Sequence, residues 1–172
     1  MFIRVATLED AAYLPRIEKS ASELYRAIPH LDWLAAGQVI ARAEHERLIL
    51  KRSVWVAETS QDNLVGFLNA EVLNHELHIW ELSVHGDWQR QGVGTGLLRS
   101  AYQYAVETGL AALTLTTFKD VPWCAPAYAK FGFKPVMNPV LHLRDALNAE
   151  AAHGLPVERR VAMRLPITRP EQ

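Results

Sequence analysis

The strongest constraint on the fold of this chain is a glycine-rich run at residues 89–96, Gln-Arg-Gln-Gly-Val-Gly-Thr-Gly. It follows a strand-like segment at 75–84 and opens an apolar helical pattern at 93–106. Glycines at such a turn let backbone N–H groups approach a ligand without a Cβ in the way. The first turn of a helix also has N–H groups without intrahelical partners and the positive end of the helix dipole. The run therefore predicts a strand–turn–helix unit that binds an anionic group such as a phosphate.

Length and composition limit the class of protein. A chain of 172 residues fits one domain, so we expect a single domain over 1–172. The 18 basic and 19 acidic residues nearly cancel, which argues against a nucleic-acid-binding protein. Cys124 is the only cysteine, which excludes an internal disulfide and a multi-cysteine metal site. The sequence has neither a signal-peptide pattern nor an apolar run of membrane-spanning length, so we expect a cytoplasmic protein without membrane contact.

The order of the expected elements indicates the fold class. Alternating apolar residues, turn residues and helix-capping patterns divide the chain into short strands and helices. This order predicts an α/β fold with a mixed, mostly antiparallel central sheet flanked by helices. We expect strands at 2–6, 54–58, 64–73, 75–84, 111–117, 133–136 and 157–165, and helices at 7–25, 37–49, 93–107, 123–131 and 143–152.

Two motifs in this order resemble the GNAT superfamily of N-acetyltransferases. The first is the segment 81–85 running into 89–94, which matches the family's Gln/Arg-x-x-Gly-x-Gly/Ala turn. The second is Tyr128 followed by Gly132 and Phe133, like the family's Tyr-x-x-x-Gly-Phe ending. The spacing Gly-x-Gly-x-x-Gly of dinucleotide-binding folds and the Gly-Lys-Ser/Thr of nucleotide P-loops are both absent from the run. The resemblance extends over most of the chain and implies the GNAT fold.

The resemblance implies an acyl-CoA site, with acetyl-CoA as the co-substrate. In such a site the backbone N–H groups of 91–96 would hold the pyrophosphate, and the pantetheine arm would pair with the strand end at 82–84. A backbone N–H near Val84 would polarise the thioester carbonyl. The implied cofactor-binding residues are Leu82, Ser83, Val84, Gln89, Arg90, Gln91, Gly92, Val93, Gly94, Thr95 and Gly96.

Acetyl transfer to an amine needs a proton acceptor for the amine and a proton donor for the departing thiolate. Tyr128 matches the family's general acid, although it could also be a buried packing residue. The base is left open between His78 and Glu81. An imidazole titrates near neutral pH, and partial burial can raise the pKa of a carboxyl group into the same range. Period-2 alternation places His78, Trp80, Leu82 and Val84 on one face of the strand and Glu81 on the other unless a bulge intervenes.

The segment 28–33 joins the first two expected helices, and in this superfamily that connection commonly covers the acceptor pocket. We therefore expect His30, Asp32, Trp33 and, from the strand, Trp80 to contact the acceptor, although an ordinary loop with a buried Trp33 fits the segment equally well. No metal site is expected, because His75 and His78 have no third ligand at a suitable spacing. Many relatives carry an asparagine before the tyrosine, and the segment 119–127 has none.

The sequence thus predicts an enzyme that moves acetyl from acetyl-CoA directly to a primary amine of a small molecule. Two other interpretations stay open: an acetyltransferase that acts on protein N-termini or lysines, and a non-catalytic module that binds acyl-CoA. A homodimer is possible. The acceptor itself is not specified, because its pocket is built from loops that the motifs do not constrain.

Overall fold

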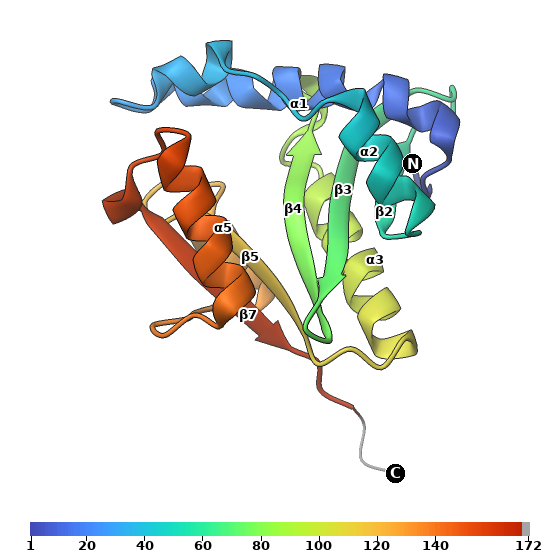
Figure 1. The fold of residues 1–172 in the computed structure, drawn as a ribbon. Helices are drawn as coiled ribbons and strands as arrows, with labels where there is room; N and C mark the ends of the chain where they lie inside the picture. Colours follow the sequence, from blue (N-terminus) through green and yellow to red (C-terminus); the bar gives the residue numbers. More distant parts are fainter. Residues whose placement is uncertain (170–172) are drawn as a thin grey trace. The chain divides into compact units, whose positions relative to one another are not determined.

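The computed structural model describes residues 1–169, and the chain divides into two compact units. The first comprises Met1–Glu71 and Glu81–Ala101, and the second comprises Val72–Trp80 and Tyr102–Gln172. Within residues 1–169, seven strands are hydrogen-bonded in the order β1-β2-β3-β4-β5-β7-β6. Figure 1 labels five of them, β2, β3, β4, β5 and β7. The pairs β1/β2, β2/β3, β5/β7 and β6/β7 are antiparallel, whereas β4/β5 is parallel. The expected mixed, mostly antiparallel sheet with flanking helices is confirmed.

The elements have the following bounds. The strands are β1 (Phe2–Val5), β2 (Val54–Glu58), β3 (Leu64–Leu73), β4 (Glu76–Val84), β5 (Ala112–Phe118), β6 (Lys134–Pro135) and β7 (Arg160–Pro166). The α-helices are α1 (Leu14–Ser22), α2 (Arg42–Leu50), α3 (Val93–Glu107), α4 (Ala125–Phe131) and α5 (Leu141–Ala152). Short 3-10 helices lie at Leu8–Ala12, Glu23–Ala27, Asp32–Ala36, Gly86–Trp88 and Val157–Arg159. None of the helices in the described part of the chain has the length and apolar character needed to cross a membrane.

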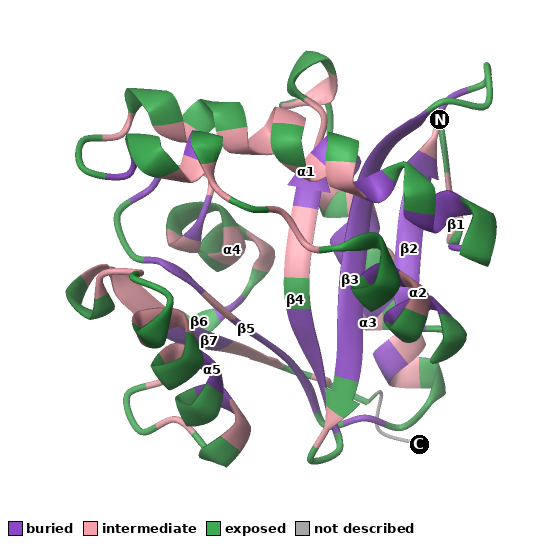
Figure 2. Ribbon diagram, turned by 45° about the horizontal axis from the view of Figure 1, so that its top comes forward, coloured by how far each residue is buried: buried purple, intermediate pink, exposed green. Residues whose placement is uncertain are grey.

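The first unit has a core between its strands and the helices α1 and α2. Phe67 of β3 lies opposite Val56 of β2, and both are completely buried. Leu14, Ile17 and Leu48 from the two helices complete this apolar cluster. Figure 2 shows β2 and β3 buried along most of their length. The continuous apolar runs of these strands are typical of strands covered on both faces.

Helix α3 packs against β3 and β1 of this unit, and glycines permit the close approach. A Cβ built on Gly66 of β3 would lie 3.0 Å from Val93 Cγ1 and 3.3 Å from the Ser83 carbonyl oxygen. A Cβ built on Gly96 of α3 would lie 2.5 Å from Ile3 Cδ1. Both glycines therefore allow the start of α3 to pack closely against β3 and β1.

The predicted helix at 7–25 is three shorter elements. Thr7 and Asp10 form a capping box, in which the Thr7 N–H donates to Asp10 Oδ2 at 2.7 Å. The Tyr13 N–H donates to the Asp10 carbonyl with 3-10 spacing, and α1 begins directly afterwards with Pro15 in its first turn. Proline has no N–H to continue an α-helical ladder, so it starts a new helix instead. The prediction of one continuous helix was wrong at this point.

Other boundaries differ by a few residues. The helix expected at 37–49 begins only at Arg42, and the last strand begins at Arg160 because Val157–Arg159 forms a 3-10 turn. In the second unit, the expected turn between β3 and β4 is confirmed. Asn74 and His75 both have positive φ, 51° and 61°. A two-residue hairpin turn of this type requires φ > 0 at both positions, which asparagine tolerates well.

Gly66→Ala should destabilise the protein by about 1–3 kcal/mol, because the added methyl meets Val93 and a backbone oxygen that cannot move away cheaply. Urea unfolding followed by circular dichroism would measure the loss. Gly86→Ala is the matched control, since its Cβ would meet only the Ser20 hydroxyl at 3.5 Å, an ordinary contact. Equal stability of the two variants would contradict this account of the packing.

Candidate active site

The turn that connects β4 to α3 is built around two left-handed residues. Arg90 has φ 61° and Gly92 has φ 82°. The Gly96 N–H donates to the Gly92 carbonyl at 3.0 Å, which is the first bond of the helix. The N–H groups of Val93, Gly94 and Thr95 precede this bond, so the helix itself provides no acceptor for them. They form the start of a 15-residue helix, where the dipole favours an anion.

Gly92 and Gly96 of the run have different structural roles. A Cβ built on Gly92 would meet nothing within 4 Å, so the space over this residue is open. Gly96 packs against Ile3, and its N–H is used by the helix. The expectation that Gly96 contributes an amide to the anion site is therefore corrected: its small size serves the packing of α3. An open loop with a row of helix-start amides fits the diphosphate of an acyl-CoA.

The two glutamines of the run hold the turn together. Gln89 Nε2 donates to the Val84 carbonyl at 3.0 Å, and Gln91 Nε2 donates to the Asp87 carbonyl at 3.1 Å. Arg90 is exposed. A role of these three side chains in binding a cofactor stays a prediction.

The end of β4 presents different residues on its two faces. A Cβ built on Gly94 would lie 3.9 Å from side-chain atoms of both Leu82 and Val84, so these two face the start of α3. The Ser83 hydroxyl is buried and donates to Glu81 Oε1 at 3.0 Å. Glu81 and Ser83 therefore share the opposite face, as the alternation predicted.

Glu18 of α1 is a functional candidate that the sequence did not indicate. Its carboxylate accepts the Ile40 N–H, at 2.8 Å to Oε2 and 3.1 Å to Oε1. Burial of this carboxyl, together with the negative charge of Glu81, raises the pKa of Glu18 to about 8, against the opposing effect of the Ile40 hydrogen bond. The Glu18 carboxyl therefore keeps its proton at neutral pH. No motif marks Glu18, because its partner lies 63 residues away in the sequence.

Other charged groups on the neighbouring elements are engaged elsewhere. Lys19 Nζ donates to the Ala35 carbonyl at 2.7 Å, and the Arg16 guanidinium lies 5.8 Å from the Tyr13 ring centroid. On α2, Arg42 pairs with Glu46 at 2.7 Å. The charge that acts on Glu18 is therefore the one on Glu81.

The loop residues predicted to contact an acceptor lie on the surface of the first unit. Trp33 is 45% exposed, and its Nε1 donates to the His30 carbonyl at 3.1 Å. His30 has φ 64°, and Asp32 begins a short 3-10 helix. The interpretation of Trp33 as a buried loop residue is wrong, and its role in acceptor binding stays a prediction.

In the second unit, His78 is buried and hydrogen-bonded. It is 1% exposed, and its Nδ1 lies 3.0 Å from Thr114 Oγ1. Trp80, which is 40% exposed, lies edge-on to it with ring centroids 4.4 Å apart, so the two share a face of β4 as predicted.

Tyr128 belongs to α4 in the same unit. Its ring lies edge-on to Phe133, with centroids 5.6 Å apart, and its carbonyl accepts the N–H groups of Gly132 and Phe133. Gly132 has φ 125°, which explains the glycine of the Tyr-x-x-x-Gly-Phe motif. Cys124, buried just before α4, accepts the Tyr128 N–H through its carbonyl.

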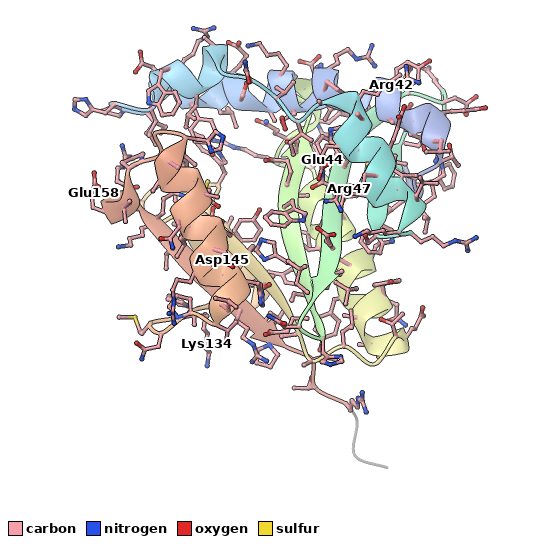
Figure 3. All side chains as sticks on the ribbon, in the orientation of Figure 1. Arg42, Glu44, Arg47, Lys134, Asp145 and Glu158 are labelled. Atoms are coloured by element: carbon pink, nitrogen blue, oxygen red, sulfur yellow. The ribbon has the colours of Figure 1, made fainter. Side chains whose placement is uncertain are left out.

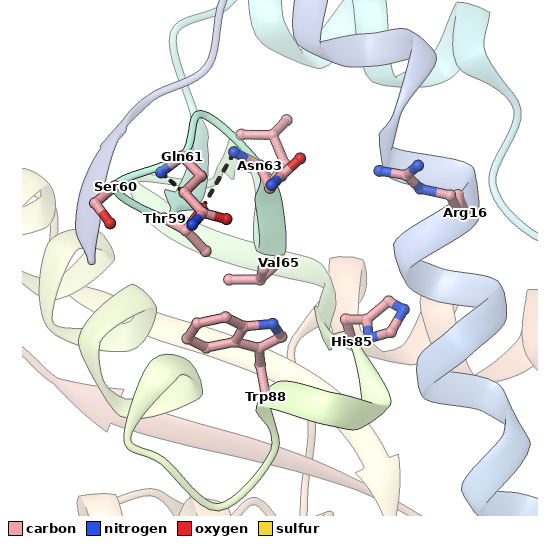
Figure 4. A pocket seen from close by; sticks show the side chains of 9 residues that line it. Arg16, Thr59, Ser60, Gln61, Asn63, Val65, His85 and Trp88 are labelled. Atoms are coloured by element: carbon pink, nitrogen blue, oxygen red, sulfur yellow. Dashed lines mark hydrogen bonds between the residues drawn. The ribbon is translucent and has the colours of Figure 1, made fainter.

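A hollow of about 560 Å³ lies beside the turn that follows β4, between the β2–β3 turn and Arg16 of α1 (Figure 4). The Thr59 hydroxyl accepts the N–H groups of Gln61 and Asn63 and shapes one wall. His85 and Trp88 form another wall. Within residues 1–169, none of the predicted site residues lines this hollow, so we do not assign it to acyl transfer.

Residues 14–133 match the model of the acetyltransferase (GNAT) family. The chain belongs to the GNAT family. It is accordingly an acyltransferase. Within the described residues, no group of three or more His, Cys, Asp or Glu side chains is arranged to hold a metal ion.

Several solved GNAT structures resemble the chain over its whole length. PaiA N-acetyltransferase of Thermoplasma acidophilum, in complex with coenzyme A, has 14% identity and a TM-score of 0.72, with 96% of this chain and 98% of that one covered. A Mycobacterium tuberculosis protein in complex with CoA has 14% identity and a TM-score of 0.69, with 98% and 100% covered. The ribosomal-protein-S18-alanine N-acetyltransferase of Escherichia coli has 20% identity and a TM-score of 0.62, with 99% and 96% covered. These likenesses establish a shared fold.

The raised pKa of Glu18 has a consequence for the stability of this GNAT protein. The folded state keeps the proton up to about pH 8, whereas the ordinary value is 4.5, so the folded state binds more protons in between. Stability should therefore fall as pH rises from about 5 to about 8, by up to about 1.4 kcal/mol per pH unit. Glu18→Gln should remove this decline in urea unfolding measured across that range. Glu9→Gln, at an exposed position, should retain it; a decline that persists in Glu18→Gln would contradict the assignment.

Proposed function

We propose that this GNAT acetyltransferase transfers acetyl from acetyl-CoA directly to a primary amine of a small molecule. The observation that carries the proposal is the open turn at Gly92 followed by the first-turn N–H groups of α3, which have no acceptor within the helix. These amides would hold the diphosphate of the donor, and Leu82, Ser83 and Val84 would lie along its pantetheine arm. Acetyl-CoA supplies the activated thioester. The CoA complexes of two proteins with the same fold support this choice of donor.

The acceptor must lose a proton before it attacks. An alkylamine with a pKa near ~10.4 is about three units above neutral pH, so deprotonation costs roughly 4 kcal/mol. The carboxyl groups of Glu18 and Glu81 together would attract an ammonium group and accept its proton. Because the pKa of Glu18 is raised to about 8, its carboxylate form would bind a proton near neutral pH far more readily than an ordinary carboxylate. We propose His30, Asp32, Trp33 and Trp80 as contacts of the acceptor, with His78 as the other candidate base.

The departing thiolate needs a proton in return. A phenol has a pKa near ~10, so Tyr128 would be a suitable donor to a thiol of similar acidity. Its position in the motif ending at Gly132 and Phe133 supports this role.

The charges of α2 favour a small acceptor over a peptide with a charged sequence. Arg47 pairs with Glu44 at 2.6 Å and with Glu71 at 2.9 Å, and Figure 3 shows Arg42, Glu44 and Arg47 together on this helix. Because these charges neutralise one another, the helix does not offer a docking face of a single sign.

A protein acetyltransferase is the second candidate. Two structures with the same fold are named ribosomal-protein-alanine N-acetyltransferases, from Escherichia coli and Brucella melitensis, each 20% identical to this chain. Their names favour a protein N-terminus as the alternative acceptor.

A cytoplasmic location, a homodimer and a single domain stay predictions.

The function is tested by measuring the release of free CoA thiol from acetyl-CoA with a panel of small amines and of peptides. We expect turnover with at least one small amine, and Tyr128→Phe should lower kcat about 10²–10⁴-fold while acetyl-CoA binding persists. Tyr102→Phe, at a tyrosine outside the motif, is the control and should keep the rate. Turnover of peptides alone would favour the second candidate. Binding of acetyl-CoA without any turnover would leave only a non-catalytic module.

The donor site is tested with a pair of glycine variants. Gly92 and Gly154 both have positive φ, 82° and 93°, and neither has an atom within 4 Å of a built Cβ. Alanine should therefore strain both positions by a similar amount, on the order of 1–2 kcal/mol. Only Gly92→Ala should weaken acetyl-CoA binding, by roughly tenfold in Kd measured by calorimetry. Equal affinities of the two variants would contradict the assignment of the anion site.

A further inference from the structure

Hydrogen bonds connect four side chains of the second unit, from Asn74 to His78. Asn74 Nδ2 lies 3.1 Å from His142 Nδ1. His142 Nε2 lies 3.3 Å from Thr114 Oγ1, which lies 3.0 Å from His78 Nδ1. The chain runs from the β3–β4 turn through α5 and β5 to β4. It connects an exposed asparagine to a buried histidine.

The donors and acceptors of this chain have one consistent direction. An amide nitrogen can only donate, so His142 Nδ1 must accept from Asn74. A neutral imidazole with Nδ1 as acceptor carries its proton on Nε2, so His142 Nε2 donates to the Thr114 oxygen. The Thr114 hydroxyl then donates to His78 Nδ1. His78 is left with its proton on Nε2.

We propose that Asn74, His142 and Thr114 are positioning residues that fix His78 as a neutral imidazole protonated on Nε2. This makes His78 a hydrogen-bond donor rather than a general base. For the reaction, which rests on the proposed function, the base is then Glu81 with its neighbour Glu18.

The local structure keeps these groups in place. His78 and Thr114 are register partners in the parallel pair β4/β5, so their side chains emerge side by side. Thr114 is completely buried, and a buried hydroxyl is costly unless it is hydrogen-bonded. The His78 ring also lies edge-on to His142, with centroids 5.7 Å apart. Asn74 lies in the two-residue β3–β4 turn, where its positive φ of 51° matches the turn geometry.

The direction of the chain can be reversed by a single substitution. In Asn74→Asp the carboxylate can only accept, so His142 Nδ1–H would donate a hydrogen bond to it. His142 Nε2 would then accept from Thr114, and the Thr114 oxygen would accept from His78 Nδ1–H. The proton of His78 would move from Nε2 to Nδ1. Asn63→Asp makes the same change of charge in the β2–β3 turn and is the matched control.

The test is a long-range ¹H–¹⁵N correlation spectrum of the ¹⁵N-histidine-labelled protein at about pH 8, without any substrate. We expect His78 protonated on Nε2 in the native protein and in Asn63→Asp, a shift toward Nδ1–H in Asn74→Asp, and loss of this response when Thr114→Val is added. A native His78 protonated on Nδ1, or a tautomer that Asn74→Asp leaves unchanged, would overturn the proposal. Because no substrate is present, the outcome does not depend on the proposed function.

The consequence for catalysis has its own readout. Once an acceptor has been found, His78→Gln keeps an N–H donor near the same place, whereas Glu81→Gln removes the carboxylate. We expect the rise of kcat/KM with pH to persist in His78→Gln and to disappear in Glu81→Gln. The reverse pattern would show that His78 takes the proton and would overturn its assignment as a donor.

Discussion

Three backbone N–H groups at the start of α3 have no acceptor within the helix, and the proposed binding of the donor depends on them. They belong to Val93, Gly94 and Thr95, which come before the first helical hydrogen bond, from Gly96 N–H to the Gly92 carbonyl. The space beside Gly92 is open. The close packing of α3 on β3 at Gly66 and on β1 at Ile3 fixes where these groups point. A helix start held in this way provides a preorganised anion site without any charged side chain. The choice of an acyl-CoA as the proposed donor rests on this site.

Each unit by itself contains titratable side chains whose protons are controlled by their neighbours. In the first unit, burial and the charge of Glu81 raise the pKa of Glu18 to about 8. In the second, the chain from Asn74 to His78 gives the imidazole a defined direction. A general base must accept a proton, whereas an imidazole that is protonated on Nε2 and accepts from Thr114 at Nδ1 is a hydrogen-bond donor at Nε2. Hydrogen-bond direction thus carries information that pKa values alone do not.

The sequence predicted the parts of the protein that depend on local patterns. The strand–turn–helix unit, the hairpin at Asn74 and the family follow from glycine spacing and turn residues. It did not predict the break of the first helix at Pro15, where local 3-10 bonding replaced the expected ladder. It assigned Gly96 to ligand binding, although Ile3 explains this glycine. Glu18 could not be found, because only tertiary packing places an α1 side chain near β4.

The central claim is tested most directly by backbone amide NMR of the protein titrated with coenzyme A and, separately, with pantetheine, which lacks the diphosphate. The account predicts large shifts of the Val93, Gly94 and Thr95 amides with coenzyme A and little change at these amides with pantetheine. If these three amides stay unmoved while coenzyme A binds elsewhere on the chain, the helix start does not hold the diphosphate and the account is wrong.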